Sequence, residues 1–214
     1  MFDFFLQSIN FVKLYVIFTL VFALTLGIRK KNHRLLLGIL FVSFFAELID
    51  SVLLYHKQSI GFSATLNVIL HHSLWLLILY NNCLLKKTIG MFCIAFWSFS
   101  VFNLFLGEGL TAFNFSTFIV GAFLYIVAFI LESFNHLKQE NFDFFTSNDY
   151  LLLLAPVFFF FGLTFIFGFK SKELATTVIF ENIKLYSFIM SVVNIIYYSL
   201  LTIYIYKEKK QSHV

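Results

Sequence analysis

The sequence predicts an all-α protein, an integral membrane bundle of seven transmembrane helices. Apolar residues make up 60% of the 214-residue chain and charged residues only 12%, with a mean hydropathy of +0.90. Soluble domains average about 45–50% apolar and about 25% charged residues. The apolar surface of this chain therefore exceeds what a water-soluble fold can bury, and we expect it to face lipid.

Seven apolar segments approach the roughly 20 residues that a helix needs to cross a hydrocarbon core of about 30 Å. They lie near residues 5–28, 35–55, 62–85, 88–107, 115–137, 150–169 and 179–206. Their continuous apolar character excludes barrel strands, which are about 10 residues long and alternate in polarity. The first segment lacks the basic start and the small-residue cleavage site of a signal peptide, so we interpret it as a membrane helix. The connections are short, which predicts a single domain over residues 1–214.

The Lys and Arg residues between the segments predict the orientation of the bundle. One side of the membrane carries ten of them, and the other side carries three, namely Lys57, Lys170 and Lys172. The positive-inside rule then places the amino terminus outside and the carboxyl terminus in the cytoplasm. We expect the protein to be in contact with membrane lipid. The basic residues form short runs rather than an extended patch, so nucleic acid is not an expected partner.

Ionisable side chains occur within the second and third segments. An acidic group at the centre of a bilayer costs about 2.5–3.5 kcal/mol on insertion scales, so it is expected to face protein or water. At a rise of 1.5 Å per residue, Glu47 lies roughly 12 Å below the outer end of its helix near Tyr55. His71 lies roughly 13–14 Å below the start of its own helix near Phe62. The two side chains are therefore expected to meet at similar depth.

Three interpretations of this pair remain open. The first is a structural hydrogen bond or ion pair between helices, the second is a ligand- or proton-responsive pocket, and the third is a metal or catalytic site. Histidine titrates near neutral pH, which favours a responsive pocket, whereas zinc needs three or four convergent ligands and adjacent histidines on a helix diverge. The metal and any cofactor stay unknown, and no catalytic residue is assigned. The predicted ligand-binding residues are Glu47, Asp50, Asn67, His71, His72 and Lys184.

A second polar group lies near the cytoplasmic end of the fifth segment. It contains Glu132, Asn135 and His136, which we interpret as an interfacial anchor in preference to a site. Glu181 and Lys184 are expected to form a local pair at the start of the seventh helix. Cys83 and Cys93 lie on either side of a predicted cytoplasmic turn, where a disulfide is not expected. Their spacing does not match that of a metal-binding motif.

The second half of the chain carries polar landmarks in a long apolar setting. They are NVILHHSLWLLILYNNCL, VFN at 101–103, YIVAFILESFNHLKQEN followed by LLLLAPVFFFFGLTFIFGF, and SVVNIIYYSLLTIYIYKEKK. Through these features, over roughly residues 62–210, the chain resembles a family of uncharacterised seven-helix membrane proteins from Bacteroidota. Members often carry a Glu where this chain has His71 and His72, and often lie beside sensor histidine kinases. The resemblance implies a bacterial inner membrane and a role in sensing, and it assigns no catalytic residue.

Three functions are compatible with these features. The first is a sensor or signalling accessory with a polar pocket between the second, third and seventh helices. It would act through a membrane signalling protein such as a histidine kinase, because no connection is long enough for an output domain. The alternative is an intramembrane hydrolase acting on lipid, with or without a metal ion. A small carrier or channel ranks third, because carriers usually show repeats and interrupted helices. An enzymatic role stays open and ranks below sensing.

Overall fold

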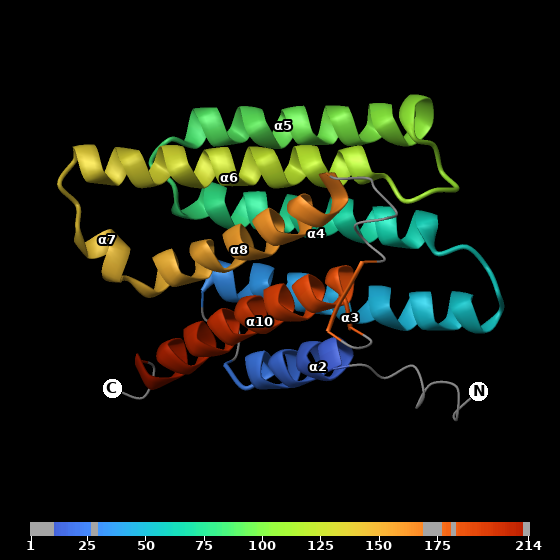
Figure 1. Cartoon of the computed structure of the whole chain (residues 1–214). Coiled ribbons are helices and arrows are strands. Elements are labelled where there is room, and N and C mark those ends of the chain that lie inside the picture. The colour runs from blue at the N-terminus through green and yellow to red at the C-terminus, as the bar shows by residue number, and fades with distance from the viewer. Residues whose placement is uncertain (1–10, 27–29, 169–176, 181–182, 212–214) are drawn as a thin grey trace.

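The computed structural model describes residues 11–26, 30–168, 177–180 and 183–211. Within these residues the protein is a bundle of long helices, of which six are long and apolar enough to cross a membrane (Figure 1). They are α3 (Lys31–Tyr55), α4 (Gly61–Asn82), α5 (Lys86–Phe102) with its π-helical extension η1 (Asn103–Gly107), α6 (Phe115–Lys138), α8 (Asn148–Gly168) and α10 (Leu185–Gln211). The predicted all-α membrane fold is confirmed to this extent.

The first predicted span is shorter in the structure than the sequence indicates. Helix α2 (Phe11–Leu24) has 14 residues, which cover about 21 Å at 1.5 Å per residue. A hydrocarbon core of about 30 Å needs more than that. Residues 5–10 and 27–28 of the predicted span lie outside the described residues, so a seventh span is not established.

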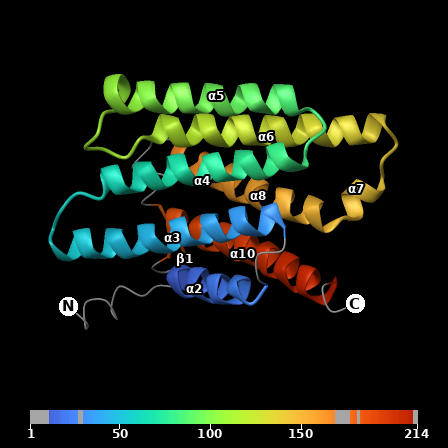
Figure 2. The same cartoon turned by 180° about the vertical axis from the view of Figure 1, so that it is seen from behind.

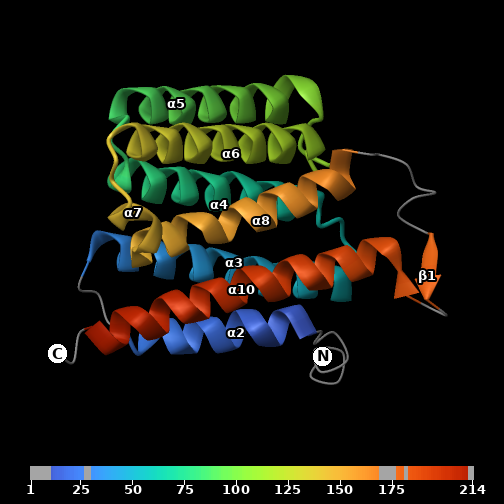
Figure 3. The same ribbon diagram turned by 60° about the vertical axis from the view of Figure 1, so that its left-hand side comes forward.

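The start of the last predicted helix is wrong. Helix α10 begins at Leu185, and the residues before it form strands β1 (Val178–Phe180) and β2 (Ile183–Lys184), paired antiparallel. Figure 3 shows this hairpin projecting beyond the start of α10. The run of Thr, Val, Ile and Phe at 177–180 suits an extended chain, because β-branched and aromatic residues favour strands. Glu181 lies outside the described residues, so its predicted pair with Lys184 stays a prediction.

The helices alternate in direction, and α4 lies in the middle of the bundle. It contacts α3, α5, α6 and α8, while α10 packs on α8 and α2. Helix α5 forms one edge of the bundle and α2 the opposite edge (Figure 2). We call the end at which α3, α5 and α8 begin the basic end, because it carries Lys31, Lys86, Lys87, Lys138, Lys207, Lys209 and Lys210.

An apolar layer fills the bundle on the side of the basic end. Trp75, Ile78 and Leu79 of α4 are fully buried, together with Leu40 of α3 and Leu201 of α10. Leucine and isoleucine side chains dominate this layer, as close packing in a protein interior requires. The layer separates the polar groups at the basic end from those in the other half of the bundle.

A buried carboxylate joins three helices at the basic end. Glu208 of α10 is only 4% exposed, and it accepts hydrogen bonds from Asn148 Nδ2 at 2.9 Å and from Lys30 Nζ at 2.8 Å. Its Oε2 also lies 3.0 Å from His33 Nε2. A buried charge is tolerated where several donors surround it. The end of α10 is thereby fixed to the starts of α3 and α8.

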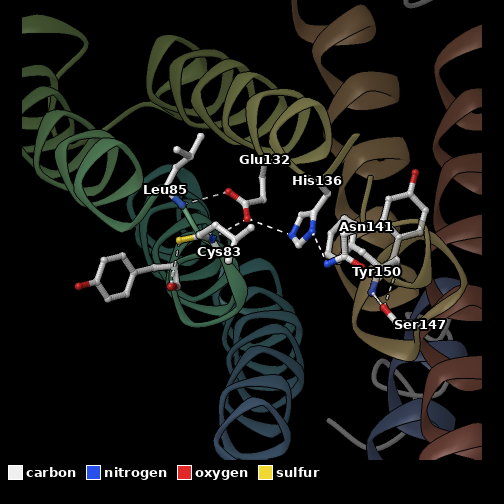
Figure 4. A network of polar contacts seen from close by, with 10 residues as sticks. Cys83, Leu85, Glu132, His136, Asn141, Ser147 and Tyr150 are labelled. Carbon is white, nitrogen blue, oxygen red and sulfur yellow. Dashed lines mark hydrogen bonds and ion pairs between the residues drawn. The ribbon is translucent and has the colours of Figure 1, made fainter. Parts of the chain in front are cut away.

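A second carboxylate holds the turn between α4 and α5 (Figure 4). Glu132 of α6 accepts hydrogen bonds from the backbone N–H groups of Leu84 at 2.6 Å and Leu85 at 3.3 Å. Its Oε1 lies 3.2 Å from His136 Nε2, and His136 Nδ1 lies 3.0 Å from the Asn141 amide nitrogen. These contacts are those of a structural anchor, and they satisfy backbone donors at the start of α5 that have no helical partner.

Candidate ligand-binding site

A cavity of about 480 Å³ lies between six helices in the half of the bundle away from the basic end. Helix α4 contributes residues from its first half to the wall, α8 from its second half and α10 from its first half. Small-molecule pockets typically measure about 300–1,000 Å³. The polar residues that line the cavity are Ser43, Glu47, Asn67, His71, His72, Tyr186, Ser187, Ser191, Asn194 and Tyr198.

The structure brings four of the six predicted ligand-binding residues to this cavity. Glu47 of α3 and Asn67, His71 and His72 of α4 all line it. The wall also includes α10, so the three helices expected to enclose a polar pocket do share one. Helices α2, α6 and α8 contribute as well, which was not predicted from the sequence.

Two predicted residues lie elsewhere. Lys184 is an exposed residue of strand β2 and is not among the described residues that line the cavity. Asp50 lies about one helical turn beyond Glu47, in the direction of the α3–α4 connection and beside Ser63. The Oδ1 atom of Asp50 is buried and has no hydrogen-bond partner within the described part of the chain.

Glu47 finds its partner on α2 rather than on α4. Its Oε2 lies 3.7 Å from Lys13 Nζ, and Lys13 also donates a 2.8 Å hydrogen bond to Ser51 Oγ. No hydrogen bond or ion pair joins Glu47 to His71 in the described structure, so the expected direct contact between them does not form. An intramembrane carboxylate pairs with the nearest available cation, and Lys13 occupies that place.

His71 lines the cavity, and Tyr197 of α10 lies behind it. The Nε2 atom of His71 lies 3.3 Å from the Tyr197 hydroxyl, which accepts a 3.1 Å hydrogen bond from Trp75 Nε1. The rings of Phe159 and Phe160 lie 5.5 Å and 5.9 Å from the His71 ring, measured between centroids. His71 is therefore part of a small polar group enclosed by aromatic rings.

His72 points to another side of the cavity wall. Its Nδ1 lies 2.8 Å from the backbone oxygen of Val68. The ring stacks on Phe160, with centroids 4.3 Å apart and planes inclined by 16°. Gly121 of α6 lets the neighbouring helix approach, because a Cβ atom there would lie 2.5 Å from His72 Cδ2. The two adjacent histidines thus diverge as expected, yet both reach the same cavity.

Most of the aromatic wall and part of the polar wall were not predicted from the sequence. Phe159 and Phe167 of α8 line the cavity, and neither is among the predicted site residues. A usable signal was present on α10. Ser187, Ser191 and Asn194 follow one another at spacings of four and three residues, which places polar groups on one helical face.

The described residues offer no metal centre. No group of three or more His, Cys, Asp or Glu side chains lies close enough together in the described ranges to hold a metal ion. Structural and catalytic zinc sites need at least three protein ligands. A metal-dependent version of the hydrolase hypothesis therefore has no ligand set within this part of the chain.

The chain matches no protein-family model, no curated protein and no solved structure with which it was compared. Its function is therefore inferred from the geometry of the cavity and of the helices around it.

Proposed function

We propose that this integral membrane protein is a sensor or signalling accessory whose cavity receives a small molecule from outside the cell. The same proposal places seven spans in the inner membrane of a bacterium, as the sequence predicts. The basic end then faces the cytoplasm, in accordance with the positive-inside rule. The cavity faces the opposite side.

The observation that carries this proposal is the position of the cavity above a layer of buried apolar side chains. The cavity lies in one half of the bundle, and the buried apolar layer around Trp75 and Leu201 lies beneath it. An apolar layer between the cavity and the basic end suits binding and reporting, whereas transport needs a path to the other side. Carriers also commonly place their sites at broken helices near the midplane, and α4 and α10 are continuous at this level.

Helix α10 is the element that connects the cavity to the basic end. It contributes Ser191, Asn194 and Tyr198 to the cavity wall, and its last turns hold Glu208. A ligand that shifted α10 would therefore change the surface formed by Lys207 and Lys210 at the basic end. A histidine kinase that contacts this surface is the partner implied by the family resemblance, and it forms part of the proposal.

A cavity-blocking variant tests whether the cavity binds small molecules at all. Ala64 lines the cavity, so Ala64→Phe should place a ring inside it and obstruct it, and Ala95→Phe places the same ring on an exposed face of α5. Wild-type and variant proteins in lipid nanodiscs would be titrated with a panel of phenyl-bearing amines, alcohols, ethers and acids. Binding by the wild type and by Ala95→Phe, but not by Ala64→Phe, is expected.

The sensing step is tested by a distance measurement on the same samples. Spin labels at the exposed positions Lys87 and Lys207 report the separation of α5 and α10 at the basic end. A bound probe should change this distance by about 1–2 Å, the size of common helix shifts, and Ala64→Phe should show no change. Binding without any change in this distance would show that the protein binds the probe but transmits no movement to the basic end. That result would refute the sensing role.

A further inference from the structure

We infer that the cavity takes a ligand that donates hydrogen bonds, namely a non-anionic molecule with an apolar body and N–H or O–H groups. This inference rests on the proposed function and names the chemical class of its ligand. It follows from the direction of the hydrogen bonds that the cavity wall already makes.

Three polar side chains of the wall donate to a carbonyl oxygen one turn earlier in their own helix. His72 Nδ1 lies 2.8 Å from Val68 O, Asn194 Nδ2 lies 2.8 Å from Met190 O, and Ser191 Oγ lies 2.8 Å from Ser187 O. A carbonyl oxygen only accepts hydrogen bonds, so each side chain must be the donor. Their donor capacity is thereby used within the protein.

The atoms that remain on these three side chains are acceptors. With a proton on Nδ1, a neutral His72 ring has an accepting Nε2, although this atom is enclosed by the packing around the ring and is not open to the cavity. The Asn194 amide nitrogen also lies 3.8 Å from Met190 Sδ, so both of its hydrogens have acceptors and Oδ1 remains. Ser191 keeps the lone pairs of its hydroxyl oxygen.

The charged groups near the cavity favour the same class of ligand. Glu47 presents a carboxylate, which only accepts, and Asp50 lies close enough to interact with it electrostatically. Lys13 is the cation at this carboxylate. An anionic ligand would face two acids across one lysine, whereas an ammonium or hydroxyl group would meet acceptors.

Most of the remaining wall groups can accept as well as donate. The Asn67 amide can present either its oxygen or its nitrogen, and the hydroxyls of the lining Ser and Tyr residues can do either. His71 is the exception, because its Nε2 accepts from Tyr197 and its Nδ1 then carries the proton. The other side of the wall is aromatic, with Phe118, Phe159 and Phe167. Aromatic faces accommodate an apolar body and attract an ammonium group. A ligand that carried only acceptors would leave the fixed acceptors of the wall without partners after desolvation.

The test compares four probes of similar shape on the protein in nanodiscs. 2-Phenylethylamine and 2-phenylethanol carry donors, whereas 2-phenylethyl methyl ether and phenylacetate carry only acceptors. The amine and the alcohol should bind at least tenfold more tightly than the ether and phenylacetate. An ether or phenylacetate that bound as tightly as the alcohol and the amine would overturn the inference.

Matched variants locate the effect in the wall. Ser191→Ala and Asn194→Leu should weaken binding of the alcohol and the amine several-fold. Ser100→Ala removes an equivalent hydroxyl that donates to Phe96 O at 2.7 Å on α5, away from the cavity, and should leave binding unchanged. Glu47→Gln should weaken the amine alone, which separates an ammonium ligand from a hydroxyl ligand. Equal affinities in Ser191→Ala, Asn194→Leu and Ser100→Ala would contradict the inference.

The outcomes also separate this inference from the proposed function. If all four probes bind equally and Ala64→Phe abolishes their binding, the cavity binds small molecules but the ligand class is wrong. If no probe binds the wild type more tightly than it binds Ala64→Phe, the inference and the proposed function both fail.

Discussion

The hydroxyl of Tyr197 lies 3.3 Å from Nε2 of His71, and this contact joins α10 to α4 beside the cavity. The same hydroxyl accepts a hydrogen bond from the indole of Trp75. An indole N–H only donates, so the hydrogen of Tyr197 remains available for His71. A movement of α10 against α4 at this level would break both contacts, which makes Tyr197 the residue that registers a shift of α10.

Replacing Tyr197 with Phe should therefore destabilise the fold. The change leaves the fully buried Trp75 N–H without its acceptor. Hydrogen bonds between membrane helices contribute about 0.6 kcal/mol on average and up to about 1.7 kcal/mol, and we expect a loss of about 1 kcal/mol in the free energy of unfolding. Unfolding in mixed micelles by added SDS measures it. The exposed Tyr206 provides the control, because Tyr206→Phe should change stability by less than about 0.5 kcal/mol.

Gly121 should not tolerate a methyl group. A Cβ atom at this position would lie 2.5 Å from His72 Cδ2 and 2.7 Å from Phe96 Cε2, so Gly121→Ala must displace rings that are packed on all sides. Overpacking of this kind costs about 1–3 kcal/mol. At Gly38 the nearest atom would be 3.8 Å away, and Gly38→Ala should be neutral or stabilising. Thermal unfolding of both variants checks this order, and equal melting temperatures would contradict the packing of α6 on α4.

The Glu208 network should depend on the carboxylate far more than on its exposed cation. Glu208→Ala leaves the buried His33 and the Asn148 amide without their acceptor, at a cost of about 1–3 kcal/mol for each unsatisfied group. Lys30 is 54% exposed, and exposed ion pairs contribute at most about 1 kcal/mol. In an SDS titration, Glu208→Ala should therefore lower the free energy of unfolding by much more than Lys30→Ala does. The reverse order would show that the network is held by surface charge.

The thiol of Cys83 should be unreactive at neutral pH. Burial and the Glu132 carboxylate raise its pKa to about 11. An ordinary thiol has a pKa of about 8.5, so at about pH 8 the thiolate fraction of Cys83 is about two orders of magnitude smaller. Labelling by iodoacetamide in a Cys93→Ser background should be slow and should rise about tenfold per pH unit up to about pH 10.

The same pKa shift has a consequence for stability. The pKa of Cys83 is higher in the folded protein than in the unfolded chain, so above about pH 9 the unfolded chain loses its proton first. Stability should therefore fall between about pH 9 and pH 11, and Cys83→Ser should reduce the fall. A labelling rate at about pH 8 equal to that of a free thiol would contradict the burial of this group.

The sequence predicts the spans of this protein better than their ends. Length and continuous apolar character define α3, α4, α5, α6 and α8, because lipid requires these properties of any helix that crosses it. The start of α10 depends on the local preference of the residues around Val178, which form a strand. The length of α2 depends on where its helix begins, which an apolar run alone does not mark.

The candidate site shows a similar division. Of the residues expected to form a polar pocket, Glu47, Asn67, His71 and His72 share one cavity. Their partners could not be derived from depth alone, since depth does not fix the rotation of a helix. Lys13 was visible in the sequence as a cation within a span, and the rule that intramembrane charges pair would have matched it to Glu47. The approach of Tyr197 to His71 requires the packing of α10 against α4.

The proposed function requires a cavity that holds water and opens to the side opposite the basic end. A cysteine introduced at Ser191, with Cys83 and Cys93 replaced by serine, tests this requirement through a charged, membrane-impermeant methanethiosulfonate reagent. In right-side-out vesicles the reagent should modify Ser191→Cys rapidly, and Ala64→Phe in the same protein should slow the reaction at least tenfold. Modification only in inside-out vesicles, or none in either orientation, would contradict the proposed function.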